Sequence, residues 1–202
     1  MAMYIGVDEA GRGALAGPVS VGVVMAAEDF DWRVAYALVT KRGEVKLRDS
    51  KKLSPEQRDT LYEFIIANTQ LKHASALVPA SQIDAIGIVP ATLEAAAMAI
   101  ASLGVASGSA RVMLDAGLRV PDVWQQESFV RGDESIPVIA LASIIAKVSR
   151  DRMMTKVGPM YAAYGLEGHK GYGTAAHLAA IREHGFSDIH RRSFCGALQM
   201  GE

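Results

Sequence analysis

The sequence predicts a single-domain α/β fold: a mixed sheet of about five strands, helices on both sides, and a small helical extension at the C-terminal end. Short runs rich in valine and isoleucine alternate with segments that carry helix start and stop signals, which is typical of such a fold. With 202 residues, 50% of them hydrophobic, residues 1–202 can form one substantial core without a second domain. The expected extension is the glycine- and histidine-punctuated segment 157–202.

Composition excludes several classes of protein. The only cysteine, Cys195, cannot form an internal disulfide and fits a reducing compartment. The chain has no run of about 18 apolar residues to span a bilayer, and its N-terminus lacks the basic-then-apolar pattern of a signal peptide. We therefore expect a cytoplasmic protein with no membrane partner. The formal net charge is −1, so a nucleic-acid partner would have to be held by local basic patches.

The first strand, residues 4–10, delivers two adjacent carboxylates into a turn. Asp8 and Glu9 repel each other, and a cation between them would relieve the repulsion. Neighbouring side chains of a regular strand point to opposite faces of the sheet. We therefore expect the strand to stop or bulge at Asp8 if both carboxylates are to reach one metal ion.

The turn that follows, residues 11–13, is Gly-Arg-Gly. Gly11 and Gly13 let backbone amides face a ligand that a Cβ atom would keep away, and Arg12 places a planar cation between them. For an isolated Asp-Glu-x-Gly segment, a solvated turn with an incidental arginine is the simpler interpretation. The local sequence leaves both open.

The next elements follow from local signals. Residues 18–25 are rich in valine and predict a second strand that forms a hairpin with the first, whereas residues 28–46 show no clear period. Ser54, Pro55 and Gln57 predict a helix start with a capping box. The remaining predicted elements are strands over 71–78, 111–115 and 129–130 and helices over 90–103, 137–154 and 174–184.

Two lysines, Lys51 and Lys52, lie just before the helix that starts at Ser54. An anion is favoured at a helix N-terminus, so a phosphate group would satisfy both the helix and the lysines; an exposed basic loop is the alternative. Basic residues gather in two patches: Lys41, Arg42, Lys46, Arg48, Lys51 and Lys52 against Glu44 and Asp49, and Lys170, Arg182, Arg191 and Arg192 with four of the five histidines. Such patches favour a polyanionic partner.

Two further carboxylates stand at the ends of predicted elements. Asp115 ends a strand and so lies at the carboxyl edge of the sheet, where α/β proteins bind ligands, although a turn-initiating aspartate is the simpler local interpretation. Asp133 precedes the helix over 137–154, where a capping and a catalytic aspartate fit equally well. We expect Asp151, within that helix, to be a structural ion-pair partner.

The C-terminal segment offers an aromatic side chain among basic residues. Tyr172 lies in a glycine-flanked loop and can either stack on a sugar or base or simply be half-buried. Arg191 and Arg192 are compatible both with phosphate contacts and with a hydrated surface. The histidines are scattered and unaccompanied by cysteine, so we do not expect a zinc site.

Five blocks of the chain resemble, in the same order, the type 2 ribonucleases H and specifically bacterial ribonuclease HII. They are GVDEAGRGALAGPV from Gly6, DSKKLS from Asp49, ASIIAKVSRD from Ala142, HKGY from His169 and HRRSF from His190. The blocks span nearly the whole chain. The Gly-Arg-Gly turn favours ribonuclease HII over ribonuclease HIII, which typically has Gly-Lys-Gly and an additional domain.

The resemblance implies a ribonuclease H-like fold and an activity. The expected enzyme hydrolyses the RNA strand of RNA/DNA hybrids and cuts on the 5′ side of single ribonucleotides in duplex DNA, leaving a 5′-phosphate and a 3′-hydroxyl. This activity would serve ribonucleotide excision repair and RNA primer removal. The implied catalytic residues hold two divalent ions, Mg²⁺ or in its place Mn²⁺, and are Asp8, Glu9, Asp115 and Asp133.

The resemblance also implies how the substrate is held. Gly11, Arg12 and Gly13 would read the ribose 2′-hydroxyl, which separates RNA from DNA, and Tyr172 would pack against the neighbouring sugar. The other implied substrate contacts are Ser50, Lys51, Lys52, Lys170, Arg191 and Arg192, several of them in the extension 157–202. We expect the protein to act as a monomer.

The chain departs from the family pattern at three places. One is Gly87; the others are Asp115-Ala116-Gly117, where relatives usually have Asp-Gly-Asn, and Gly173, where relatives usually have proline. Two alternatives to the implied function stay open. Another metal-dependent nuclease of the same fold would ignore an embedded ribonucleotide, and an inactive nucleic-acid-binding module would bind without cutting.

Overall fold

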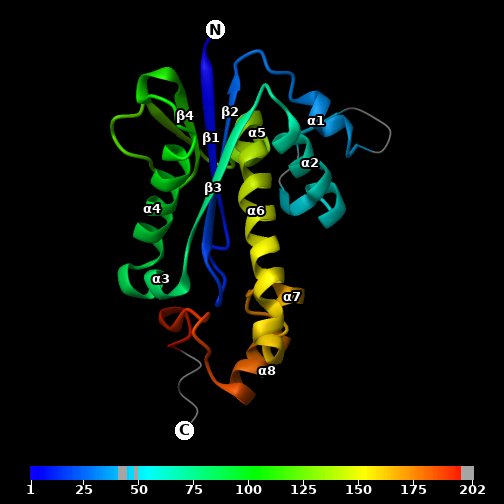
Figure 1. Ribbon diagram of the computed structural model, residues 1–202, viewed down its shortest axis with the longest axis vertical. Helices are drawn as coiled ribbons and strands as arrows, with labels where there is room; N and C mark the ends of the chain where they lie inside the picture. The colour runs from blue at the N-terminus through cyan, green and yellow to red at the C-terminus, as the bar shows by residue number, and fades with distance from the viewer. Residues whose placement is uncertain (41–44, 48–49, 197–202) are drawn as a thin grey trace.

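The computed structural model describes residues 1–40, 45–47 and 50–196, and it confirms the predicted α/β fold. Its centre is one five-stranded mixed sheet in the order β3-β2-β1-β4-β5. The strands are β1 (Met3–Ala10), β2 (Val19–Ala27), β3 (Lys72–Val78), β4 (Arg111–Asp115) and β5 (Gln126–Phe129). The central strand β1 pairs antiparallel with β2 and parallel with β4 (Figure 1). The predicted hairpin of the first two strands is therefore confirmed.

The structure corrects the prediction of a strand break at Asp8. β1 keeps a regular register with β2 through both carboxylates, because Asp8 faces Gly22 and Glu9 faces Val21 in the ladder. The pairing of β1 with β4 on its other side ends earlier, at Val7↔Leu114. The two carboxylates therefore sit on a strand that is paired on one side only.

The helices alternate with the strands largely as predicted. They are α1 (Arg33–Ala37), α2 (Pro55–Ala67), α3 (Ala80–Ile86), α4 (Ile88–Ala101), α5 (Gly132–Ser135), α6 (Pro137–Val157), α7 (Leu166–His169) and α8 (Ala175–His184), with 3-10 turns at Ser50–Lys52, Ser107–Ser109, Gly158–Tyr164 and Arg192–Phe194. Ser54 caps α2, and Gln57 returns the bond in the predicted capping box. Thr174 caps α8 by accepting a hydrogen bond from the backbone N–H of His177.

Two elements differ from the prediction. α3 was not predicted, because its seven residues are too few to show a helical period. It joins α4 through Gly87, whose φ of +86° is readily adopted by glycine, and α4 accordingly starts at Ile88, before Pro90. β5 ends at Phe129, so the strand predicted over 129–130 lies earlier in the chain than expected.

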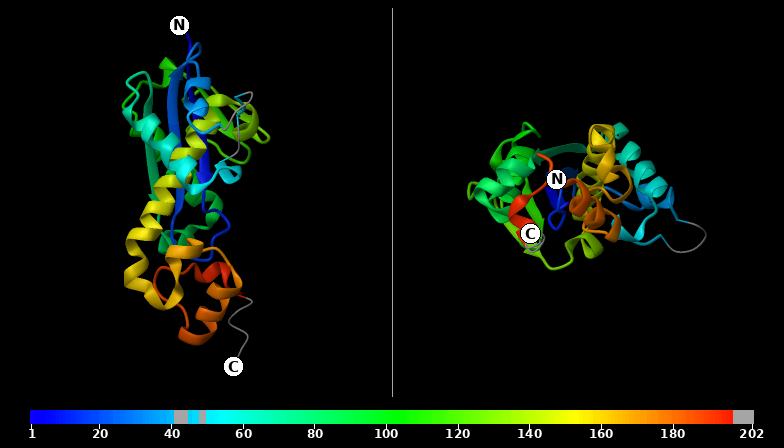
Figure 2. Two further views of the ribbon diagram at one scale, coloured as in Figure 1. Left: turned by 90° about the vertical axis from the view of Figure 1, so that its right-hand side faces the viewer. Right: turned by 90° about the horizontal axis from the view of Figure 1, so that it is seen from below.

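Helices cover both faces of the sheet (Figures 1 and 2). α3 and α4 lie on one face, and α6 with α2 lies on the other. Each face has its own apolar core. The first core includes Ile5, Val7, Val21, Ile100 and Leu114, and the second includes Val24, Leu61, Leu141, Ile144 and Val148. Burial of both faces of the central strands stabilises the sheet that carries the acidic residues.

The helix α6 packs unusually close to the sheet because two strand residues lack side chains. A Cβ atom on Gly6 would lie 2.1 Å from the backbone oxygen of Val138, and one on Gly22 would lie 2.5 Å from that of Ala142. Gly22 pairs with Asp8 in the ladder. The close approach therefore brings the middle of α6 beside the acidic end of β1.

Residues 158–196 form a helical extension beyond the end of the sheet, at the bottom of the view in Figure 1. It is bonded to the loop that follows the Gly-Arg-Gly turn. The backbone N–H groups of Leu15 and Ala16 donate to the oxygen of Gly171 at 2.8 and 3.2 Å, and Ala16 forms an antiparallel bridge with His190. None of the described helices combines the length and apolarity needed to cross a bilayer.

Candidate active site

Three carboxylates meet where β1 and β4 end side by side. Asp8 and Glu9 come from β1 and Asp115 ends β4, and each offers an oxygen atom within 4.8 Å of the others'. The parallel pairing of Val7 with Leu114 sets the next residues of both strands next to one another. The structure therefore brings together three of the four carboxylates that the sequence predicted as one site.

The negative charges of these buried carboxylates repel one another. Burial, followed by the charges of Glu9, Asp115 and Asp133, raises the pKa of Asp8 well above its usual value, although the N–H of Glu9 donates to Asp8 Oδ1 at 2.8 Å. Burial also raises the pKa of Glu9, against the opposing effect of Arg12, whose guanidinium lies 3.5 Å from Glu9 Oε1. The other oxygen, Glu9 Oε2, is buried without a hydrogen-bond partner. Crowded oxygen ligands with unsatisfied negative charge fit a hard divalent cation.

Asp133 lies beside this cluster rather than within it. It is buried in the short helix α5, and its negative charge contributes to the raised pKa of Asp8. Asp115 positions α5, because its Oδ1 accepts a hydrogen bond from the N–H of Gly132 at 2.9 Å. The departure at Ala116 does not prevent a turn here: the N–H of Leu118 donates to the oxygen of Asp115, and Gly117 adopts a φ of +83°.

A cavity of about 510 Å³ opens beside the carboxylates. Its lining combines the acidic residues, the glycine turn and several cations, and consists of Asp8, Glu9, Ala10, Gly11, Arg12, Gly13, Ser50, Lys51, Arg58, Ser143, Lys147 and Tyr172. The turn, Ser50, Lys51 and Tyr172 had all been predicted as substrate contacts. Segments from both ends and the middle of the chain thus converge on one cavity.

Four predicted contacts lie outside this cavity, and three of them are Lys52, Lys170 and Arg192. Lys52 forms an ion pair with Glu134 at 2.9 Å on the surface. Lys170 donates from Nζ to the hydroxyl of Thr155 at 2.7 Å and to the backbone oxygen of Glu167, and its side chain lines a neighbouring groove. Arg192 is exposed on the last 3-10 turn.

Arg191 does not lie on the surface that the sequence suggested. Its side chain is 0% exposed, and it donates to the backbone oxygens of Gly17 at 2.9 Å and Arg12 at 3.0 Å. This placement corrects the expectation of a direct phosphate contact, because a fully buried guanidinium cannot meet a bound duplex. The sequence could not show this, since adjacent arginines at a turn look alike whether they point inward or outward.

Sequence reasoning missed three residues that line the cavity, Arg58, Ser143 and Lys147. Arg58 also donates to the backbone oxygens of Ser50 and Leu53 at 3.0 and 2.7 Å, which holds the loop before α2. A signal was present, because Ser143 and Lys147 are polar residues four positions apart in the otherwise apolar stretch 137–148 of α6. Lys147 forms an ion pair with Asp151 at 2.9 Å, so the predicted structural role of Asp151 is confirmed.

A second, basic groove of about 750 Å³ adjoins the cavity and shares Arg58, Lys147 and Tyr172 with it. Its other cations are Arg152, Lys156 and Lys170. Of the predicted patch between residues 41 and 52, the following lie outside the described residues: Lys41, Arg42, Glu44, Arg48 and Asp49. The groove also carries Asp59, Asp151 and Glu167, and its excess of cations beside the cavity suits a phosphodiester backbone.

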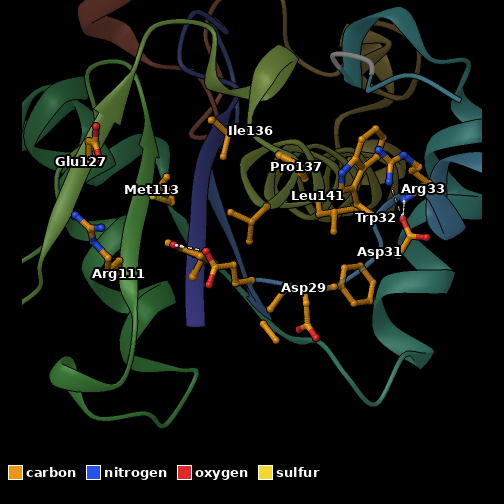
Figure 3. Close-up of a pocket in the computed structure, with 16 residues that line it drawn as sticks. Asp29, Asp31, Trp32, Arg33, Arg111, Met113, Glu127, Ile136, Pro137 and Leu141 are labelled. Atoms are coloured by element: carbon orange, nitrogen blue, oxygen red, sulfur yellow. Dashed lines mark hydrogen bonds and ion pairs between the residues drawn. The ribbon is translucent and has the colours of Figure 1, made fainter. Parts of the chain in front are cut away.

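A third pocket, of about 490 Å³, has a different character (Figure 3). Met113 and Leu141 contribute to an apolar lining, and Trp32 lies beside Arg33 and Asp31 at one side. Its rim carries several carboxylates, including Asp29 and Glu127. This rim would repel a polyanion, so the pocket is not part of a nucleic-acid site.

Three histidines support the loop that carries Tyr172. The backbone N–H of Ser187 donates to Nδ1 of His190 at 3.1 Å, so the other ring nitrogen of His190 carries the proton and donates to Nε2 of His177 at 3.1 Å. His177 then donates from Nδ1 to the oxygen of Tyr172 at 3.0 Å. His169 stacks on His177 at 4.3 Å. These three histidines therefore contact one another and fix the backbone at Tyr172 by hydrogen bonding.

Comparisons with known proteins show a family match. A family model described as Ribonuclease HII matches residues 5–197. Ribonuclease HII of Coxiella burnetii is 43% identical over 193 residues, which cover 95% of this chain and 88% of that protein. Ribonuclease HII of Chlamydia abortus is 38% identical over 200 residues, which cover 98% and 86%.

Solved structures show the same fold. The crystal structure of the ribonuclease H2 from Pyrococcus horikoshii OT3 has a TM-score of 0.73 at 24% identity, covering 98% of this chain and 100% of that chain. Bst-RNase HIII in complex with Mn²⁺ has a TM-score of 0.63 at 15% identity, covering 99% and 71%. With the family match across nearly the whole sequence, the chain belongs to the ribonuclease HII family, whose members are endoribonucleases that cleave RNA in RNA/DNA hybrids.

Proposed function

We propose that this ribonuclease HII works with two divalent ions, Mg²⁺ or in its place Mn²⁺, held by Asp8, Glu9, Asp115 and Asp133. The single observation that carries the proposal is the cluster of Asp8, Glu9 and Asp115 oxygens within 4.8 Å of one another, beside a buried fourth carboxylate. The unpartnered Glu9 Oε2 and the raised pKa of Asp8 support it, because both would be relieved by bound cations. When bound, such ions supply an activated water for in-line attack and stabilise the leaving 3′ oxygen.

The chain's own residues bind and orient the substrate. The backbone of the turn Gly11–Gly13 contacts the ribose 2′-hydroxyl, and Tyr172 packs against the adjoining sugar, so that only a ribonucleotide places its 5′ phosphate correctly. Lys51 and Arg58, which line the cavity, hold phosphates of the same strand. The next stretch of backbone follows the basic groove of Lys147 and Lys170.

The proposed substrates are RNA/DNA hybrids and duplex DNA that contains single ribonucleotides. Cleavage falls on the 5′ side of the ribonucleotide and leaves a 5′-phosphate and a 3′-hydroxyl. Asp8, Glu9, the turn, Lys51 and Tyr172 all reach one cavity of one chain, which supports action as a monomer.

Cleavage of a labelled DNA duplex with one ribonucleotide, in magnesium, tests the proposal. We expect one cut immediately 5′ to the ribonucleotide, no cut in an all-DNA duplex, and no cut by the Asp8→Asn variant. Asp122→Asn is the matched control, because Asp122 is exposed and pairs with Arg119 on the surface. Equal cutting of the all-DNA duplex would indicate another nuclease, and binding without cutting in magnesium or manganese would indicate a binding module.

A further inference from the structure

Two arginines are completely buried behind the Gly-Arg-Gly turn. Arg150 comes from α6 and Arg191 from the C-terminal segment, and the side chains of both are 0% exposed. Neither lines the cavity beside the carboxylates. A buried arginine is rare unless its charge is needed, since placing two cations in the interior carries a large desolvation cost.

The two guanidinium groups hold backbone oxygens of one short loop. Arg191 donates to Arg12 at 3.0 Å and to Gly17 at 2.9 Å. Arg150 donates to Pro18 at 2.8 Å, to Ala16 at 3.0 Å and to Lys170 at 2.9 Å. The carbonyl of Arg12 accepts a hydrogen bond from the buried guanidinium of Arg191, while the turn Gly11–Gly13 also lines the cavity.

Arg150 also sets the shape of the turn and of the tyrosine loop directly. A Cβ atom on Gly11 would lie 1.9 Å from Nε of Arg150, so the turn rests on the guanidinium itself. On its other side, Arg150 Cζ lies 5.3 Å from the centroid of the Tyr172 ring. One side chain therefore contacts both of the parts that are proposed to read the sugar.

The charge of this pair is not balanced by an ion pair in the described part of the chain. Burial lowers the pKa of Arg150, and burial with the charge of Arg150 lowers the pKa of Arg191 to about 9. One nitrogen, Nη2 of Arg191, is buried without a hydrogen-bond partner. Apolar residues of similar volume would fill the same space at less cost, so packing alone does not account for the pair.

The segment that carries Arg191 is fixed from both sides. Its backbone N–H donates to the oxygen of Leu15 at 2.8 Å. Immediately after it, the N–H groups of Arg192 and Ser193 donate to the carboxylate of Asp84 in α3 at 2.8 and 3.0 Å. Asp84 thus holds the chain in the position from which Arg191 points inward.

We propose that Arg150 and Arg191 are positioning residues that hold the turn Gly11–Gly13 and the ring of Tyr172 in one fixed geometry for the ribose. The inference rests on the proposed sugar-reading role of these two parts. Neither arginine touches the substrate. Both act by fixing the backbone that does, and this explains why the extension is bonded to the turn so extensively.

The physical expectation follows from the shape of the guanidinium. A lysine keeps the positive charge but replaces a planar fork by a single ammonium that cannot span two separated carbonyls in the same way. The turn would then be displaced. A displacement of about 1 Å at a site that orients reacting groups can reduce the rate about 10²-fold.

The experiment compares Arg191→Lys and Arg150→Lys with the control Arg119→Lys, an exposed arginine that pairs with Asp122 and lines neither the cavity nor the basic groove. The first measurement is kcat and KM on the duplex with one ribonucleotide. The second is amide hydrogen exchange of residues 11–17 without substrate. We expect kcat to fall about 10²-fold with a smaller change in KM, and exchange to accelerate in residues 11–17 but not in α6.

The proposal is wrong if both variants match Arg119→Lys in kcat and exchange, or if lost activity only follows the fraction of unfolded protein in thermal melts. Asp84→Asn covers the case in which the arginine variants do not fold, because Asp84 is on the surface. We expect this variant to show the same changes in kcat and exchange at smaller size. If it shows no change in either, the proposal is contradicted. If the wild-type enzyme cuts nothing, the proposed function fails, while hydrogen exchange still decides whether the arginines hold the turn.

Discussion

The two sides of the Gly-Arg-Gly turn bury charge in opposite ways. At the end of β1 the carboxylates of Asp8, Glu9 and Asp115 crowd together, and one buried oxygen of Glu9 has no partner. Behind the turn the guanidinium groups of Arg150 and Arg191 are fully buried, and five backbone oxygens accept their hydrogen bonds, although Nη2 of Arg191 has no partner. The fold thus supplies acceptors to the buried cations, whereas the crowded carboxylates repel one another. We infer that the arginine region is a frame that holds the turn and that the acidic region awaits a ligand.

The largest effect is expected when the frame is broken at its closest contact. Gly11→Ala places a Cβ atom 1.9 Å from Nε of Arg150 at a φ of +83°. Backbone strain of about 1–3 kcal/mol and a similar overpacking term lower the free energy of unfolding by about 3 kcal/mol or more. Gly13→Ala is the matched control, since no atom lies within 4 Å of its added Cβ, and its stability should be unchanged. Urea unfolding of both variants measures this, and equal loss in the two would contradict a frame centred on Gly11.

The acidic side is tested by adding its ligand. If the carboxylates await cations, magnesium should raise the melting temperature, because a ligand at about 100 times its Kd stabilises the folded state by about 2.7 kcal/mol. Asp8→Asn removes one of the repelling charges. We expect this variant to melt at a higher temperature than the wild type in EDTA and to gain less from magnesium. A wild type whose melting temperature does not respond to magnesium would show that the acidic cluster is already satisfied.

His190, the neighbour of Arg191 in the chain, predicts that the folded protein loses stability in acid. Burial, with the neighbouring His177, lowers the pKa of His190 to about 4. Because the unfolded chain binds a proton on this histidine more readily, the stabilising contribution is complete above about pH 6.5 and is lost as the pH falls toward 4. We expect the midpoint of urea unfolding to decrease over that interval. His190→Gln, which does not titrate, should be less stable throughout but show a smaller decrease; an equal slope would assign the acid sensitivity to other groups.

The smallest effects are expected from substitution of the neighbouring residues Lys51 and Lys52, which should differ in their effect on KM. Lys52 pairs with Glu134 on the surface, so Lys52→Ala should change the free energy of unfolding by about 0.5 kcal/mol or less and leave KM nearly unchanged. Lys51 lines the cavity, and loss of a charge-assisted contact to phosphate should raise KM about tenfold at low salt. Steady-state kinetics at two salt concentrations distinguish them. Equal effects of the two substitutions would contradict the assignment of Lys51 alone to the cavity.

Local signals in the sequence were sufficient for most of the elements. The capping box at Ser54 and Gln57 and the apolar run from Pro137 depend on neighbouring residues only, and both elements form as predicted. The short helix α3 was missed because seven residues hold too little periodicity. The predicted break at Asp8 was wrong because strand pairing is set by a partner, and β4 ends one residue after its last pairing with β1.

The sequence by itself determined the chemical groups of this protein: the carboxylates at strand ends, the glycines of the turn, the cations near them and the family to which the chain belongs. Only the tertiary structure decided which groups meet. Arg191 and Arg192 are neighbours in the chain, yet one is buried under the turn and the other is exposed. Lys147 and Arg58 reached the cavity without being predicted. The physical reason is that residue type sets what a side chain can bind, whereas the packing of distant segments sets which way it points.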